Sequence, residues 1–211
     1  VLLLLVIAGG ISLVQKLKNR QSAPAQMTIE QTKYIEASPD FKVELLTPNE
    51  YSRPQLAIDT VNGIVIHYTA NPGTTAEQNR SYFESLAQTK ETYASSHFVI
   101  GIEGEIIQCI PCNEIAYASN DRNNDTISIE CCIPDDSGKF TDATYESLTE
   151  LTAWLMGRYN LTKDQVIRHY DVTGKNCPKY YVENPDAWSQ FKEDLLTYID
   201  TYGIEKKQEI N

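Results

Sequence analysis

Positive charge is scarce in this chain of 211 residues, which has 18 Lys and Arg against 29 Asp and Glu and a formal net charge of -11. Proteins that bind nucleic acid neutralise its phosphates with clustered Lys and Arg, so the composition argues against nucleic acid as the main partner. The same balance gives no electrostatic attraction to an anionic surface. If the protein acts at such a surface, another feature must hold it there.

Internal repeats and low-complexity segments are also lacking. The content of 41% hydrophobic and 22% charged residues is typical of a globular protein, and the length allows one catalytic-sized domain with appendages. Residues 21–50 are polar, contain Pro24, Pro39 and Pro48, and show no hydrophobic period. We therefore expect a linker over 21–50, a domain over 51–203 and a polar tail over 204–211.

The N-terminus has a long apolar run. Residues 1–14, VLLLLVIAGGISLV, are apolar apart from one Ser and two Gly, and a basic segment follows. The chain begins without Met, and a few further residues before Val1 would complete the roughly 20 residues of a membrane span. We expect residues 1–20 to be a membrane anchor with a basic flank. The alternatives are a cleaved signal peptide, for which Ala23-Pro24-Ala25 has the A-x-A form, and a buried helix.

The remaining sequence alternates between strand and helix patterns. Helices are predicted from Thr74 to about 88, opened by a Thr74–Glu77 capping box, from 141 or 142 to 159, and over 186–202. Glu103-Gly104 predicts a hairpin between two of the strands. The mixture predicts an α/β domain with a mixed central β-sheet flanked by helices. Its expected strands are GIVIHYT (63–69), HFVIG (97–101), EIIQCI (105–110) and TISIECCI (126–133).

Histidine is rare, with three in the chain, and two of them suggest a metal site. His67 ends a predicted strand, and the late stretch VIRHYDVTGKNCP contains His169 and Cys177. Two imidazoles and a thiolate suit Zn²⁺, and three protein ligands leave one tetrahedral position open, as a zinc hydrolase requires. The spacing by itself is a weak signal, because a lone histidine at the end of a strand is more often structural.

Glu130 and Lys175 are candidate catalytic residues. Glu130 interrupts an apolar strand, where an ionised carboxylate is costly to bury unless it is paired or faces a cleft. It is therefore a general base, a solvent-facing residue of an edge strand, or the partner of a buried Arg. Lys175 stands two residues before Cys177 and would stabilise a developing oxyanion, although a lysine in a loop is commonly only a solvated charge.

Four blocks together carry a family resemblance: GIVIHYTANPGTTAEQN, SSHFVIG, TISIECC and VIRHYDVTGKNCP. Over about residues 60–190 the chain resembles the zinc-dependent N-acetylmuramoyl-L-alanine amidases of the type-2 class. These share their fold with phage lysozyme-type amidases and peptidoglycan recognition proteins. The resemblance implies that His67, His169 and Cys177 bind zinc, and that Glu130 and Lys175 assist catalysis.

Two positions depart from the family pattern. Ser96 stands where some relatives have a catalytic Tyr, which points to the branch that depends on Glu130. The loop AYASN (116–120) has Ala118 and Ser119 where a His often lies near the substrate, so the substrate contacts stay open. We expect His97, which follows Ser96, to be structural and to pack at the start of its strand; a contact with substrate is the alternative.

The other four cysteines allow three interpretations. They would form a second zinc site, a redox pair with C-x-x-C spacing, or buried small apolar residues with room for one disulfide in an exported domain. Adjacent cysteines point to opposite sides of a strand, which disfavours the zinc site, and the last interpretation is the one we expect. The residues are Cys109, Cys112, Cys131 and Cys132.

The expected function is hydrolysis of the amide bond between N-acetylmuramic acid and the L-alanine of the stem peptide. We expect a monomer anchored in the membrane at the bacterial cell surface, with peptidoglycan as its partner. The anchor would make electrostatic attraction to the wall unnecessary, and a secreted form is the alternative location. A recognition module that binds peptidoglycan without cleaving it, and a zinc peptidase that cuts within the stem peptide, are the alternative functions.

Overall fold

The computed structural model describes residues 32–206, so the predicted anchor and the first part of the predicted linker lie outside the described residues. A six-stranded sheet has the order β2-β5-β4-β6-β3-β7, in which β4 and β5 are antiparallel and the other neighbours parallel. The predicted mixed sheet is therefore confirmed. Its strands are β2 (Lys42–Val43), β3 (Gly63–Tyr68), β4 (Phe98–Ile100), β5 (Ile106–Gln108), β6 (Thr126–Cys131) and β7 (Val166–Arg168).

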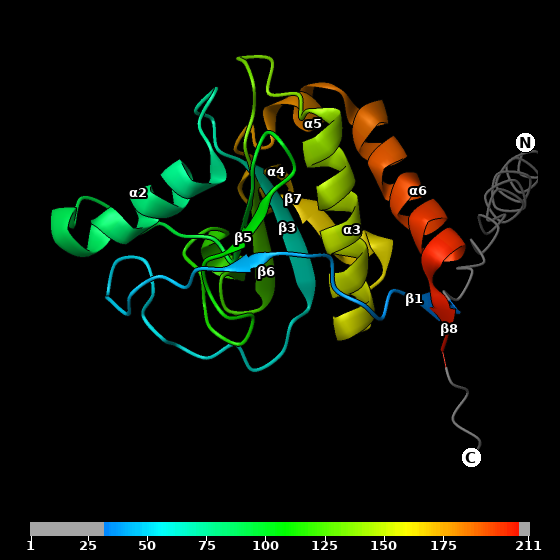
Figure 1. Ribbon diagram of the computed structural model, residues 1–211, viewed down its shortest axis with the longest axis horizontal. Helices are drawn as coiled ribbons and strands as arrows, with labels where there is room; N and C mark the ends of the chain where they lie inside the picture. Colours follow the sequence, from blue (N-terminus) through cyan, green and yellow to red (C-terminus); the bar gives the residue numbers. More distant parts are fainter. Residues whose placement is uncertain (1–31, 207–211) are drawn as a thin grey trace, which may run out of the picture. The chain divides into compact units, whose positions relative to one another are not determined.

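Helices cover both faces of this sheet. Helices α3 (Asp142–Tyr159) and α6 (Pro185–Tyr202) lie side by side on one face, and α2 (Ala76–Thr89) lies on the other (Figure 1). Because side chains alternate along a strand, each strand supplies both layers. In β6, Ile127 and Ile129 join the core beneath α3 and α6, whereas Cys132 after the strand joins the core beneath α2. Among residues 32–206, no helix combines the length and the apolar character needed to cross a membrane.

The first long helix begins one residue later than the capping pattern predicts. Thr75, and not Thr74, is the N-cap of α2, and its hydroxyl accepts a hydrogen bond from the backbone N–H of Gln78. The Gln78 side chain accepts in return from the backbone N–H of Thr75. The Thr74 hydroxyl instead donates to the carbonyl of Asn71, which removes it from the helix end.

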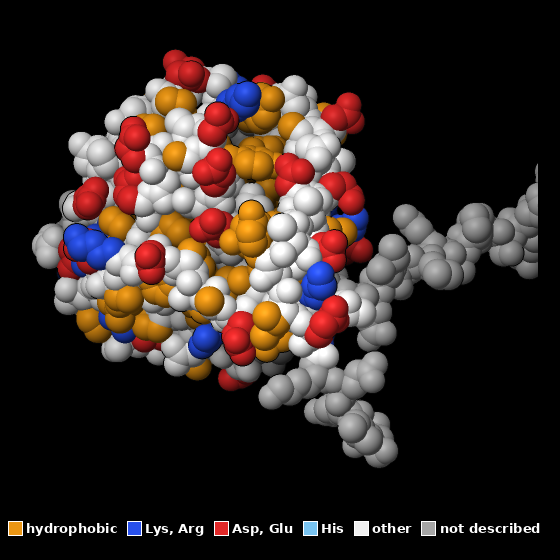
Figure 2. Space-filling view, turned by 45° about the vertical axis from the view of Figure 1, so that its right-hand side comes forward, with side chains coloured by type: hydrophobic (Ala, Val, Ile, Leu, Met, Phe, Trp, Pro, Cys, Tyr) orange, Lys and Arg blue, Asp and Glu red, His pale blue; other side chains and the backbone are white. Residues whose placement is uncertain are grey.

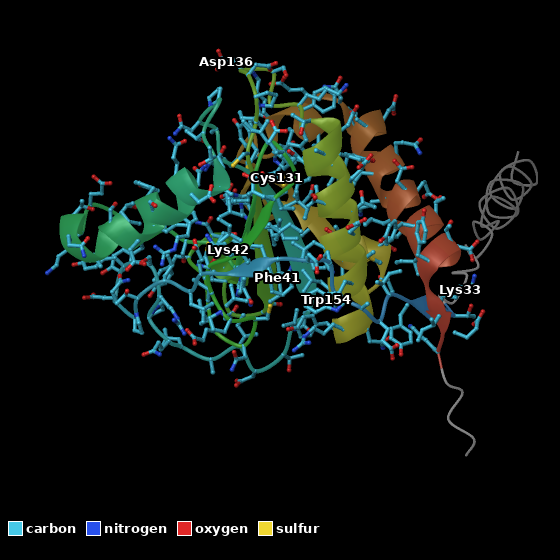
Figure 3. The ribbon with its side chains drawn as sticks, in the orientation of Figure 1. Lys33, Phe41, Lys42, Cys131, Asp136 and Trp154 are labelled. Atoms are coloured by element: carbon cyan, nitrogen blue, oxygen red, sulfur yellow. The ribbon has the colours of Figure 1, made fainter. Side chains whose placement is uncertain are left out.

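The predicted linker and tail contribute to the folded unit. Strand β1 (Lys33–Tyr34) pairs with β8 (Ile204–Glu205), and β2 pairs with β5 at the edge of the main sheet. Phe41 lies beside Trp154 of α3, with ring centroids 6.0 Å apart (Figure 3). The compact unit begins at Thr32 and so includes described residues of both the predicted linker and the predicted tail. Strands of two residues leave no period for a sequence pattern to detect.

The late stretch VIRHYDVTGKNCP begins with two short ordered elements. Val166–Arg168 form β7, which pairs in parallel with β3, and His169 opens the short helix α4 (His169–Thr173). A second short helix, α5 (Lys179–Glu183), follows Pro178. The strand β7 places His169 directly beside the carboxyl end of β3.

Candidate metal and catalytic site

Three parallel strands bring the candidate residues to one edge of the sheet. His67 is the last but one residue of β3, Glu130 is the last but one of β6, and His169 directly follows β7. Because β6 and β7 both pair in parallel with β3, all three carboxyl ends lie at the same edge. Ligands of open α/β sheets bind at this edge.

The strand register places His67 and Glu130 on the same face of the sheet. They lie opposite each other in the β3–β6 ladder, and side chains at paired positions project to the same side. The preceding pair, Ile66 and Ile129, belongs to the core beneath α3 and α6. The side chains of His67 and Glu130 therefore project from the opposite face, away from that core.

His67, His169 and Cys177 converge at this edge. One potential ligand atom from each lies within 4.8 Å of the other two, and this is the only such group of His, Cys, Asp and Glu that residues 32–206 form. The two Nδ1 atoms of His67 and His169 are 3.1 Å apart, and Cys177 Sγ is 3.9 Å from His67 Nδ1. The side chains are buried, with 1%, 7% and 2% of their residue surfaces exposed, respectively. The structure thus brings together the three predicted ligands.

Burial favours the uncharged forms of these three side chains. It lowers the pKa of His67 well below the usual value, and the charges of His169 and Lys175 act in the same direction. The pKa of His169 is also lowered, by burial and then by Lys175. Burial raises the pKa of the Cys177 thiol to about 12. Neutral imidazole is the form that binds a metal. The thiol must lose its proton before its sulfur can bind a cation.

Glu130 has the environment of a proton-transfer group. Burial raises the pKa of its carboxyl to about 8, and the positive charge of Lys175 opposes this rise. The Oε2 atom is buried and has no hydrogen-bond partner in the described part of the chain. A carboxyl whose pKa lies near neutrality can both accept and release a proton at physiological pH.

Lys175 lies close enough to influence the site while its side chain stays exposed. Its charge affects the pKa values of His67, Glu130, His169 and Cys177. The Lys175 carbonyl accepts a hydrogen bond of 2.6 Å from the backbone N–H of Cys177, which fixes the turn between them. Within residues 32–206 the ammonium group itself makes no hydrogen bond or salt bridge, so the geometry leaves it free to act on another group.

Further polar atoms line the same edge without partners. Like Glu130 Oε2, the Thr69 Oγ1 and Glu105 Oε2 atoms are buried and have no hydrogen-bond partner within residues 32–206. Thr69 directly follows β3, and the Glu105 carboxylate lies over Gly101 at the end of β4. A Cβ atom at Gly101 would lie 1.6 Å from Glu105 Oε1, so glycine leaves the space that this carboxylate occupies. Unpaired buried acceptors are unfavourable, and hydrogen-bond donors of a ligand would satisfy them.

Two residues that contact the histidines were not assigned a role from the sequence. His67 Nε2 lies 3.1 Å from Ser119 Oγ, and His169 Nε2 lies 3.0 Å from Asn120 Oδ1. Both residues belong to the loop AYASN, which the sequence marks only by the absence of a histidine. No local pattern indicates that this loop reaches two side chains from other strands.

His97 is structural, as predicted. It is 1% exposed, its Nδ1 accepts from the backbone N–H of Ser128 at 3.0 Å, and its Nε2 donates to the carbonyl of Glu114 at 2.9 Å. Burial lowers its pKa to about 4. A second proton would have to bind Nδ1, which already accepts a hydrogen bond from the N–H of Ser128. These contacts therefore favour neutral histidine.

His97 is therefore expected to make stability depend on pH. Its unfolded pKa is about 6.5, so between pH 6.5 and pH 4 the unfolded chain binds more protons and stability falls as the pH falls. Between pH 7.5 and pH 4.5 the free energy of unfolding is expected to fall by about 2–3 kcal/mol less in His97→Gln than in the wild type. Urea unfolding in the presence of a chelator measures this difference. Equal pH dependence of the two proteins would contradict this assignment.

The four remaining cysteines pack largely as small apolar residues. Cys109, Cys131 and Cys132 are buried, Cys112 is partly buried, and all are free thiols. Burial raises the pKa of Cys109 and Cys132 to about 12. Cys131 and Cys132 belong to the two different cores on opposite faces of the sheet. The prediction of buried apolar residues is thus confirmed for the three buried thiols.

The fold and the cluster together define an α/β domain with a candidate metal centre at the carboxyl edge of its sheet. Residues 58–180 match the family described as N-acetylmuramoyl-L-alanine amidase, and the chain belongs to this family. The resemblance seen in the four sequence blocks is therefore confirmed.

Known relatives agree with this family. A probable N-acetylmuramoyl-L-alanine amidase of Bacillus licheniformis is 35% identical over 157 residues, which are 69% of this chain and 44% of the relative. The amidase BlyA of Bacillus subtilis (strain 168) is 34% identical over 187 residues, 79% of this chain and 49% of BlyA. The chain thus spans about half the length of these curated relatives.

Solved structures confirm the predicted fold class. The catalytic domain of XlyA superimposes with a TM-score of 0.63 at 28% identity, over 74% of this chain and 99% of that domain. The structure of PlyL gives the same TM-score of 0.63 at 24% identity, over 74% of this chain and 97% of PlyL. The similarity extends over nearly the whole of both structures.

Proposed function

We propose that this domain hydrolyses the amide bond between N-acetylmuramic acid and the L-alanine of the peptidoglycan stem peptide. One observation carries the proposal: in a chain of the amidase family, His67, His169 and Cys177 converge beside Glu130 at the carboxyl edge of the sheet. The substrate is a neutral amide at the cleaved bond, so neither the low content of Lys and Arg nor the net charge of -11 opposes binding at the reacting centre.

The donor set fits a zinc ion. Two buried imidazoles direct Nδ1 atoms to one point, and a thiol lies beside them, so the site offers the nitrogen and sulfur ligands that zinc prefers. A thiolate with two neutral imidazoles would leave a net charge of +1 on a bound Zn²⁺. When bound, zinc would supply Lewis-acid chemistry that polarises the carbonyl of the scissile amide and acidifies water.

Glu130 transfers the protons in this proposal. It takes one proton from the attacking water as the new C–O bond forms, and it gives a proton to the amide nitrogen as the C–N bond breaks. One water is consumed, and the products are the lactyl carboxylate of the sugar and the free amine of the stem peptide. In the metal-free site, burial raises the pKa of Glu130 to about 8, so its protonated and ionised forms are both accessible near neutral pH.

The other polar groups at the edge bind and stabilise substrate. The ammonium of Lys175 stabilises the negative charge that develops on the oxygen of the scissile carbonyl. Thr69 and Glu105 supply buried acceptor atoms, which suit the N–H groups of a peptide or of an acetamido sugar. These roles explain why polar atoms without protein partners gather at this edge.

Digestion of purified peptidoglycan tests the proposal. Mass spectrometry is expected to show intact glycan strands and released stem peptides whose first residue is L-alanine with a free amine. Products cut within the stem peptide would indicate a zinc peptidase instead. Binding to peptidoglycan with no released product would indicate a recognition module. The control is the same digestion after the protein has been stripped of metal with a chelator.

Replacing Lys175 by Ala is expected to lower turnover by about 10²- to 10³-fold while zinc content stays near one per chain, because its partner is the developing oxyanion. Lys179→Ala is the matched control. Its ammonium donates to the carbonyl of Asp136 at 2.7 Å, so this variant should keep normal turnover. Turnover on peptidoglycan and zinc content are measured for both. Normal turnover in Lys175→Ala, or loss of its zinc, would reject this role.

We also propose that residues 1–20 anchor the domain to the membrane at the bacterial cell surface. The support is the sequence of this segment, which is apolar over residues 1–14. Deleting residues 1–25 removes the segment and leaves the described unit from Thr32 untouched. The full chain is expected to sediment with membranes, and the shortened chain to stay in the supernatant with full activity. Sedimentation of both forms would reject the anchor.

A further inference from the structure

One loop contacts both histidines of the candidate metal centre. Their Nδ1 atoms face each other at 3.1 Å, so their Nε2 atoms point outward. The outward nitrogen of His67 meets the Ser119 hydroxyl at 3.1 Å, and that of His169 meets the Asn120 amide oxygen at 3.0 Å. Two adjacent residues therefore hold imidazoles that come from two different strand ends.

The loop is itself held in a defined conformation. The side-chain oxygen of Asn123 accepts hydrogen bonds from the backbone N–H groups of Ala118 and Ser119. The N–H of Asn123 donates to the carbonyl of Asn120 at 3.0 Å, which closes the short 3₁₀ turn Asn120–Arg122. Asn120 has a φ of 52°, a left-handed conformation that Asn tolerates better than most residues. Ser119 is 1% exposed, so its hydroxyl cannot turn to solvent.

We propose that Ser119 and Asn120 are positioning residues of the metal centre, which fix the tautomer and orientation of His67 and His169 so that both Nδ1 lone pairs face the metal. This inference rests on the zinc site of the proposed function. The amide oxygen of Asn120 can only accept, so it places the proton of His169 on Nε2. The hydroxyl of Ser119 does the same for His67 when it accepts from Nε2–H.

The arrangement has a consequence for metal affinity. In a free neutral imidazole the proton exchanges between the two nitrogens, and only one tautomer presents a lone pair at Nδ1. A hydrogen-bond acceptor at Nε2 selects that tautomer and stops rotation of the ring. Loss of such an outer partner typically lowers metal affinity by about 10- to 100-fold. Because one loop holds both rings, a change in its conformation would weaken two ligands together.

Variants at Asn120 distinguish the role of its side-chain amide from the role of its left-handed backbone conformation. Asn120→Gly removes the amide and keeps a residue that readily adopts the left-handed conformation. Asn120→Asp restores an oxygen that can only accept. Asn160→Gly is the matched control, because Asn160 also has a φ of 52° and ends helix α3 away from the site. Ser119→Ala is compared with Ser52→Ala, a serine that is 0% exposed and accepts from the side-chain amide of Asn49.

Two measurements are made on the full chain. Competition with a chromophoric chelator measures zinc affinity, and long-range ¹H–¹⁵N NMR of the metal-free protein reports the histidine tautomers. Asn120→Gly and Ser119→Ala are each expected to bind zinc about 10- to 100-fold more weakly, with mixed tautomers at His169 and His67, respectively. Asn120→Asp is expected to restore the zinc affinity and the single tautomer of His169. The two control variants are expected to match the wild type in zinc affinity and in histidine tautomers.

The results also distinguish this inference from the proposed function. If Asn120→Gly and Ser119→Ala bind zinc as tightly as the wild type and keep single tautomers, the positioning role is overturned. If the wild type itself binds no zinc, the proposed function fails. The NMR comparison in the metal-free protein then still decides whether the loop selects the tautomers, and unchanged tautomers would again overturn the role.

Discussion

Glu130→Gln is expected to keep its zinc and its fold and to lose about 10²- to 10⁴-fold in turnover. The substitution preserves the size and shape of the side chain, but an amide cannot take a proton from water or give one to the leaving nitrogen. The reason to assign this role to Glu130 is its position opposite His67 in the β3–β6 ladder, together with a pKa raised to about 8 by burial. The measurement is the rate of stem-peptide release from purified peptidoglycan.

Stability distinguishes loss of chemistry from loss of structure in this variant. Between its unfolded pKa of about 4.3 and the folded value of about 8, Glu130 binds more protons in the folded state, so its contribution to stability falls as pH rises. Metal-free Glu130→Gln should therefore be at least as stable as the metal-free wild type at pH 8. Glu103→Gln removes the same charge from an exposed turn and is the control for turnover. Wild-type turnover in Glu130→Gln would show that the base is another residue.

Cys177→Ala is expected to weaken zinc binding by more than about 10²-fold and to abolish turnover. Loss of an outer-shell partner already costs about 10- to 100-fold, and this substitution removes a direct ligand and its negative charge. Two neutral imidazoles alone would leave the full +2 charge of zinc uncompensated by protein. The measurement is zinc affinity by chelator competition, followed by turnover at saturating zinc.

Two further cysteine variants make this prediction specific. Cys177→Asp supplies another anionic ligand, so it should keep zinc and part of the activity. Cys109→Ala removes a buried thiol from the core beneath α2 and should leave zinc binding unchanged. A Cys177→Ala protein that binds zinc and cleaves peptidoglycan normally would remove Cys177 from the site and leave the proposed ligand set without its anion.

Several elements of the fold were predictable because their signals are local. The apolar runs that become β3 and β6 and the helical periods of α3 and α6 are read from neighbouring residues. The order of the four blocks was enough to indicate the family, which residues 58–180 then matched. The short strands β1, β2 and β7 were missed, because they exist through pairing with strands distant in the sequence.

The sequence by itself determined the family, the mixed α/β sheet and the identity of the candidate site residues. It could not determine their arrangement. The tertiary structure decided that His67 and Glu130 share one face of the sheet. Side chains alternate between the two faces along each strand, so which side chains of β3 and β6 share a face depends on the register of the two strands. It also decided that Ser119 and Asn120 meet the two histidines, 52 and 49 positions away in sequence. Such contacts depend on loop conformation and strand pairing across the whole domain, and no local pattern of residues encodes them.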